Sequence, residues 1–250
     1  MRLAYVRATL VLGVSKGVSD DLIANFGSTS DRTLTINNPY NIDEIVSDGR
    51  KPPSIALPGD FIVAVGRLVA AKGFSDLIAA YADGPREVPL LILGDGPERA
   101  ALEAQVAREK LSGTVIMPGF VRDPFAVMSR ARALVSASYN EGFPNAIAEA
   151  MALGVPVLAT DCPSGPAELL QGAAGMAGSA SEGKCGLLVR PGDVAGLMNG
   201  IAMLCDPVTR ARLAEAGRRR IEGFRVERIA EEYWRVFDAY AARGPRAHSP

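Results

Sequence analysis

The chain has 250 residues, of which 48% are hydrophobic and 22% charged, a balance that is typical of a globular protein with a sizeable core. The net charge of −1 argues against a nucleic-acid-binding protein, which would carry a strongly basic surface. Three widely spaced cysteines match neither a metal-ligand pattern nor an even disulfide framework, and the only histidine, His248, lies in the polar tail. We therefore expect no histidine-dependent chemistry, and a reducing, cytoplasmic setting.

Residues 1–50 predict a short α/β segment. The apolar run near the start is brief and is interrupted by Arg7, which favours a helix end over a signal peptide. We expect strands at 10–14 and 33–37 with a helix at 17–25 between them. The stretch 46–60 is rich in Pro, Gly and charge, which predicts a linker or surface loop. No apolar run approaches the ~18 residues that a membrane span needs.

A regular alternation of short apolar strands and amphipathic helices begins at Phe61. The strands are expected at 61–66, 90–94, 114–119, 133–138, 155–160 and 186–189. The helices are expected at 72–82, 97–110, 124–131, 144–153, 165–170, 193–205, 207–222 and 225–242. This pattern predicts a Rossmann-like α/β fold, a parallel sheet with helices on both faces. Ligands of such sheets bind outside the carboxyl ends of the strands, so the residues just after each strand are the informative ones.

The first of these strand ends carries two cations. Arg67 and Lys72 follow Gly66, and their guanidinium and ammonium groups suit phosphate oxygens beside a helix N-terminus. A solvated basic turn explains them equally well. At the next strand end, Asp95 and Pro97 are explained as a helix cap and a first helical residue. A full GxGxxG motif is absent there, which disfavours an NAD-dependent enzyme.

The third strand ends at Gly119, where the backbone of a glycine lets a ligand approach closely. Phe120 follows and could pack near a base. Neither residue is specific alone.

The stretch YNEGFPNAIAEAMALG, residues 139–154, is the strongest element. Pro144 is placed to open a helix, so the amides of residues 143–146 would form an anion cradle. Glu149 would lie about one turn into that helix, where a carboxylate can bind a ribose diol. Glu141 lies in the loop, nearer to a bound sugar. The competing interpretation is a capped helix with two solvated acids.

Together these stretches resemble a known family. GRLVAAKG, LLILGDGPE, MPGFV, EGFPNAIAE, AMALGVPVLATDCPSGPAELL and GLLVRPGD, in that order, resemble the carboxyl-terminal half of family 4 (group 1) retaining glycosyltransferases of the GT-B type. The resemblance covers roughly residues 8–240. The stretch DCPSGPAELL is similar to bacterial enzymes that add hexose or N-acetylhexosamine to lipid-linked glycans.

The resemblance implies a role for each candidate residue. Glu141, Arg67 and Lys72 would act on the transferred sugar and the diphosphate. The donor-binding positions would be Gly66, Gly119, Phe120, Gly142, Phe143, Asn145 and Glu149. No metal or cofactor is expected, because the cations and the helix terminus would neutralise the leaving diphosphate. The implied reaction moves a hexose or N-acetylhexosamine from a UDP-sugar to a glycan or lipid-linked acceptor with retention.

The resemblance also divides the chain. Residues 1–50 would be a remnant of the amino-terminal domain with a linker, 51–243 the donor-binding domain, and 244–250 a flexible tail. A complete amino-terminal domain would have ~150–200 residues. The alternative is thus a truncated, non-catalytic fragment that binds a nucleotide sugar. Self-association through exposed apolar surface and peripheral association with the inner face of a membrane remain open, as do an oxidoreductase and an epimerase or phosphorylase of similar architecture.

Overall fold

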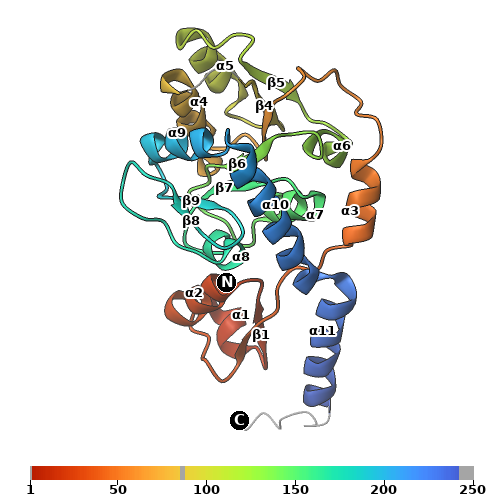
Figure 1. The fold of residues 1–250 in the computed structure, drawn as a ribbon. Helices are drawn as coiled ribbons and strands as arrows, with labels where there is room; N and C mark the ends of the chain where they lie inside the picture. The colour runs from red at the N-terminus through yellow and green to blue at the C-terminus, as the bar shows by residue number, and fades with distance from the viewer. Residues whose placement is uncertain (1, 85–87, 242–250) are drawn as a thin grey trace.

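The computed structural model describes residues 2–84 and 88–241 (Figure 1). The predicted tail at 244–250 lies outside these residues. At the centre of the fold is a seven-stranded sheet with the order β5-β4-β3-β6-β7-β9-β8. Its strands are β3 (Ile62–Val65), β4 (Leu90–Leu93), β5 (Val115–Gly119), β6 (Ala133–Ser136), β7 (Val157–Thr160), β8 (Ser181–Glu182) and β9 (Leu187–Val189). All neighbouring pairs are parallel except β8 and β9, so the predicted parallel sheet is confirmed.

Helices cover both faces of this sheet (Figure 1). Residues 36–41 are the linker that joins the first part of the chain to this sheet. The helices after this linker are α3 (Ile42–Gly49), α4 (Phe74–Asp83), α5 (Arg99–Arg108), α6 (Pro124–Met128), α7 (Asn145–Leu153), α8 (Pro166–Leu170), α9 (Val194–Met203), α10 (Pro207–Ile221) and α11 (Val226–Ala241). Two short 3-10 helices, η1 (Ala70–Lys72) and η2 (Glu222–Phe224), precede α4 and α11. None of the helices in the described ranges has the length and hydrophobicity of a transmembrane span.

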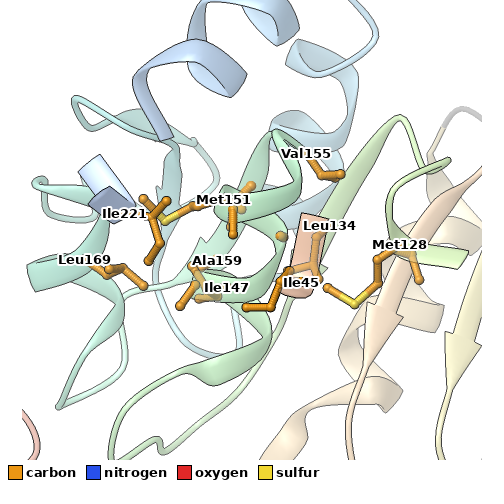
Figure 2. Close-up of a cluster of buried hydrophobic side chains, with 14 of the residues drawn as sticks. Ile45, Met128, Leu134, Ile147, Met151, Val155, Ala159, Leu169 and Ile221 are labelled. Atoms are coloured by element: carbon orange, nitrogen blue, oxygen red, sulfur yellow. The ribbon is translucent and has the colours of Figure 1, made fainter. Parts of the chain in front are cut away.

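Alternate residues of each strand enter two separate cores. In β3, Val63 packs with α3, α7 and the end of α10, whereas Ile62 and Ala64 pack with α4, α5 and α9. Figure 2 shows the first core, in which side chains from strands and helices interdigitate around Ile147 and Met151. Burial on both faces explains why the strands read as continuous apolar runs.

Residues before the linker form a smaller unit. Helix α1 (Arg2–Arg7) leads into β1 (Val11–Gly13), α2 (Lys16–Phe26) and β2 (Thr33–Thr35). Strands β1 and β2 pair in parallel and form a sheet of their own, as the predicted strands at 10–14 and 33–37 required. In Figure 1 this unit lies beyond α8, at the end of the molecule where α11 also projects.

The predicted loop at 46–60 is wrong in its first part. Residues 46–49 are the last turn of α3, a helix that begins after Asn41, whose side chain accepts a hydrogen bond from the Glu44 N–H. Ile42 and Ile45 are buried on one face of the helix and stabilise it. The Pro- and Gly-rich composition applies only to the residues after Gly49.

Two predicted helix starts are also too early. Gly73 has a φ of +62° and separates η1 from α4, so this helix starts at Phe74 rather than 72. Helix α5 starts at Arg99, with Glu98 at its cap position. Asp95 is not the cap, because its carboxylate accepts hydrogen bonds from the Gly96 N–H and from Arg99.

A carboxylate from α8 holds the start of α2. The two oxygens of Glu168 accept hydrogen bonds from the backbone N–H groups of Lys16 and Gly17, both at 2.9 Å. Gly17 packs against the loop after β7, where a Cβ would lie 2.7 Å from the Pro163 carbonyl oxygen. Glu168 therefore joins the amino-terminal unit to the large sheet.

We expect Glu168→Ala to destabilise the start of α2 by about 1–2 kcal/mol, the usual cost of removing a cap. Backbone amides of residues 16–26 should then exchange hydrogen faster, as measured by mass spectrometry, while amides of the large sheet stay protected. Glu168→Gln keeps one acceptor and serves as the milder control. If hydrogen exchange in α2 of the Glu168→Ala variant were unchanged, Glu168 would not stabilise the start of this helix.

Candidate functional site

The carboxyl ends of the neighbouring strands β3, β4 and β5 contact one another through backbone atoms. The Gly66 N–H donates to the Leu93 carbonyl at 3.0 Å, and the Gly94 N–H donates to the Gly119 carbonyl at 2.9 Å. Gly94 and Gly119 have φ values of +141° and +95°, which favour glycine. A Cβ at Gly94 would lie 1.9 Å from the Gly66 carbonyl oxygen. Glycine at position 94 is therefore needed for the ends of these strands to lie this close together.

A cavity of about 420 Å³ lies over these strand ends. Gly66, Arg67 and Phe120 line it together with Asp95 and several apolar side chains. The Phe120 ring is 74% exposed, an unusual state for a large apolar residue. Arg67 is exposed, and its guanidinium has no hydrogen bond or ion pair within the described ranges. An open aromatic face beside an unpaired cation suits a flat heterocycle that carries phosphate.

Lys72 and Glu141 form an ion pair at the next strand end. The Lys72 Nζ lies 2.6 Å from the Glu141 Oε1, and the two side chains are 28% and 12% exposed. Ser138 donates a hydrogen bond to the same oxygen at 2.7 Å. The Lys72 stem also runs beside Gly66, where a Cβ would lie 3.7 Å from its Cδ. The structure therefore brings the predicted Glu141, Lys72 and Gly66 together.

The turn that carries Lys72 is packed directly on the residues that follow β6. The Tyr139 N–H donates to the Ala71 carbonyl at 2.8 Å, and a Cβ at Gly73 would lie 2.0 Å from the Ala137 carbonyl oxygen. This contact fixes the lysine opposite the loop that holds Glu141.

A second cavity, of about 630 Å³, opens at Glu141 and Gly142. Its other walls are α2, through Gly17, Val18 and Asp21, and the loop after β7, through Pro163 and Ser164. Ser15 joins two of these walls, because its hydroxyl donates to the Gly142 carbonyl at 2.8 Å. Sequence reasoning missed this contribution of α2, and the only local signal for it was the Ser15 cap at the end of a strand.

The side chains at the start of α7 make contacts that the sequence did not predict. Pro144 occupies the cap position, and α7 begins at Asn145. The Phe143 ring is buried between the rings of Tyr40 and Phe224, at centroid distances of 6.3 and 5.8 Å, so only its backbone can face a ligand. The exposed Asn145 accepts a hydrogen bond from the Tyr40 hydroxyl at 2.6 Å.

Glu149 lies one turn into α7, half-buried, and no hydrogen-bond or ion-pair partner of its carboxylate occurs in the described ranges. Burial raises the pKa of this carboxyl above its ordinary value. A desolvated acid without a partner is typical of a site that binds a polar ligand.

In the unfolded chain this carboxyl has its ordinary pKa, and in the folded chain its pKa is higher. The folded state binds the proton more tightly, so Glu149 lowers stability as pH rises through this window. We expect Glu149→Gln to raise the Tm above that of the wild type at pH 7, with the gain vanishing near pH 4. Thermal unfolding at both pH values checks this, and a gain of equal size at both would contradict it.

The comparisons with known proteins can now be set beside this geometry. The sequence model of the family described as "Glycosyl transferases group 1" matches residues 59–206, more than half of the chain. The chain belongs to the group 1 glycosyltransferases. The matched residues contain Arg67, Lys72, Glu141 and Glu149.

Curated relatives of this group 1 glycosyltransferase act in glycan assembly. It is 31% identical to the N-acetylgalactosamine-N,N'-diacetylbacillosaminyl-diphospho-undecaprenol 4-alpha-N-acetylgalactosaminyltransferase of Campylobacter jejuni, over 92% of this chain and 60% of the relative. It is 30% identical to the lipopolysaccharide core biosynthesis glycosyltransferase LpsE of Rhizobium meliloti, over 93% of this chain and 65% of the relative. The chain thus spans less than two thirds of the length of these relatives.

Solved structures share the fold. Anabaena Alr3699/HepE in complex with UDP and glucose matches with a TM-score of 0.80 and 25% identity, over 94% of this chain and 64% of the other. A sucrose-phosphate synthase from Thermosynechococcus elongatus matches with a TM-score of 0.80 and 28% identity, over 97% of this chain and 61% of the other. The predicted GT-B architecture of this glycosyltransferase is therefore confirmed.

Proposed function

We propose that this group 1 glycosyltransferase belongs to family 4 and moves a hexose or N-acetylhexosamine from a UDP-sugar to a glycan or lipid-linked acceptor, with retention of anomeric configuration. The observation that carries the proposal is the Lys72–Glu141 pair: the Lys72 stem lies beside Gly66, which lines one cavity, and Glu141 lines the other. HepE, a structural relative, is known in complex with UDP and glucose. The C. jejuni relative is named for a diphospho-undecaprenol acceptor.

The two cavities suggest how a UDP-sugar would lie. The uracil would stack near Phe120 over the strand ends at Gly66 and Gly119, and Glu149 would accept hydrogen bonds from the ribose. The diphosphate would lie between Arg67, Lys72 and the backbone N–H groups of Phe143 and Ala146, since the Asn145 N–H already donates to the Phe143 carbonyl. The sugar would then enter the larger cavity, where Glu141 and Gly142 form one wall.

Glu141 can hold a sugar without attacking it. One of its oxygens, Oε1, accepts from both Lys72 and Ser138, which leaves the other oxygen for a sugar hydroxyl. Lys72 has three donors and uses one on Glu141, so the others can reach phosphate. In the proposed reaction the bond from the anomeric carbon to UDP breaks and the acceptor oxygen bonds to that carbon on the same face. The acceptor proton passes to the leaving phosphate, whose charge the cations stabilise.

A nucleotide-sugar screen tests the donor. UDP-sugars should raise the Tm of the chain, by RT ln(1 + [L]/Kd), more than GDP- or ADP-sugars at equal concentration. An equal or larger shift with GDP- or ADP-sugars would reject uridine as the base. Retention is tested by NMR of the transferred sugar, and an inverted anomer would reject family 4.

A second candidate is binding without transfer. It is favoured by the acceptor side of the larger cavity, which in this chain is built mainly by one turn of α2. UDP-sugar binding with no transfer to a lipid-linked glycan, and restored transfer on adding a related amino-terminal domain, would select it. A lipid-linked acceptor would place the reaction at a cytoplasmic membrane face, which co-sedimentation with vesicles tests.

A further inference from the structure

Tyr40 lies where the linker meets the segment that leads from α10 into α11. Its backbone N–H donates to the Phe224 carbonyl at 2.8 Å, and its carbonyl accepts from the Val226 N–H at 3.0 Å. These bonds form a parallel bridge between Tyr40 and Arg225. The backbone of Tyr40 is therefore fixed to a segment that is far from it in the sequence.

The Tyr40 side chain reaches from this junction to the start of α7. Its hydroxyl donates to the Asn145 Oδ1 at 2.6 Å, and the Asn38 Nδ2 donates to the same oxygen at 3.0 Å. A carbonyl oxygen has two acceptor sites, so both sites of Asn145 are filled by the linker. Burial raises the pKa of the Tyr40 phenol, which therefore stays a proton donor at every physiological pH.

The Tyr40 side chain contacts the residues on both sides of Pro144. Its ring packs on Phe143, with centroids 6.3 Å apart, while its hydroxyl holds Asn145. The proline ring restricts the backbone between these two residues. Residues 143–145 are thus held as one unit, with Glu141 before it and Glu149 one turn after it.

We propose that Tyr40, assisted by Asn38, is a positioning residue that orients the start of α7 for the donor diphosphate. This inference rests on the proposed function. Tyr40 contacts no donor atom in this scheme. It acts through Asn145. It also connects residues 143–145 to the linker that joins the amino-terminal unit to the sheet.

Tyr40→Phe removes the hydroxyl and keeps the ring on Phe143. We expect UDP, titrated by calorimetry well below the Tm, to bind this variant and Asn145→Ala about 3- to 10-fold more weakly than the wild type. The double variant should bind no more weakly than Asn145→Ala, since Asn145→Ala already removes the hydrogen bond that Tyr40→Phe removes. Tyr81→Phe is the matched control, because the buried Tyr81 hydroxyl has no partner within the described ranges. Its Kd for UDP should not change.

The outcomes separate clearly. A lower Tm of Tyr40→Phe with an unchanged Kd would show a purely structural role and overturn the inference. Additive losses in the double variant would overturn it too, because Tyr40 would then not act through Asn145. A wild-type chain that fails to bind UDP would instead reject the proposed function, and the inference with it.

Discussion

Glu149→Ala is expected to weaken UDP binding by about 1–3 kcal/mol, a factor of roughly 5 to 150 in Kd. The half-buried carboxylate has no partner of its own in the described part of the chain, and its pKa is raised by burial alone. A ribose diol would supply the missing hydrogen bonds, and without the carboxylate those hydroxyls would be left unpaired. Isothermal titration with UDP measures the change.

Glu215→Ala is the control for this variant. Glu215 is exposed on α10, where it pairs with Arg219, so its removal should leave the Kd for UDP unchanged. If Glu149→Ala binds UDP as tightly as Glu215→Ala does, Glu149 does not hold the ribose. The expected opposite effects at Glu149, better stability with Gln and poorer binding with Ala, would together mark a residue kept for function.

Gly94→Ala should be the most destabilising substitution at the strand ends. The new Cβ would lie 1.9 Å from the Gly66 carbonyl oxygen, which belongs to fixed backbone, and the φ of +141° is strained for alanine. We expect a loss of about 3 kcal/mol or more, which lowers the Tm by roughly 6–12 °C in a chain of this size. Differential scanning calorimetry checks it.

Gly59→Ala separates the two causes. Gly59 also has a positive φ, +86°, but nothing lies within 4 Å of its added Cβ. This variant should therefore lose only about 1–2 kcal/mol, the cost of the left-handed conformation. Equal losses at both positions would show that strained backbone, and not the close approach of the strand ends, controls Gly94.

Most of the fold follows from local patterns. Apolar runs such as 90–94 and 133–138 are buried on both faces, and they alternate with amphipathic helices, so the sequence alone predicts the parallel sheet. The same logic placed Lys72 and Glu141 at neighbouring strand ends, where they pair. The sequence did not predict helix α3, because a short amphipathic segment beside Pro and Gly residues is typical of a loop. Its burial against the sheet is seen only in the structure.

The supporting contacts of the site could not be predicted in this way. The hydrogen bonds from the Tyr40 hydroxyl to Asn145 and from the Gly17 N–H to Glu168 join residues more than a hundred positions apart. Neither secondary-structure propensity nor hydrophobic periodicity predicts such a pair. Nothing in the sequence indicated that the Phe143 ring is enclosed by Tyr40 and Phe224, a packing contact that leaves the predicted role of its backbone amide untested.

A calorimetric titration of the wild-type chain with UDP, beside one with NADH, tests the central claim most directly. The proposed donor site of Arg67, Lys72, Glu141 and Glu149 predicts one saturable UDP site that Glu149→Ala weakens, and no tight binding of NADH. No measurable binding of UDP, or tight NADH binding that Glu149→Ala abolishes, would contradict a nucleotide-sugar site at these strand ends.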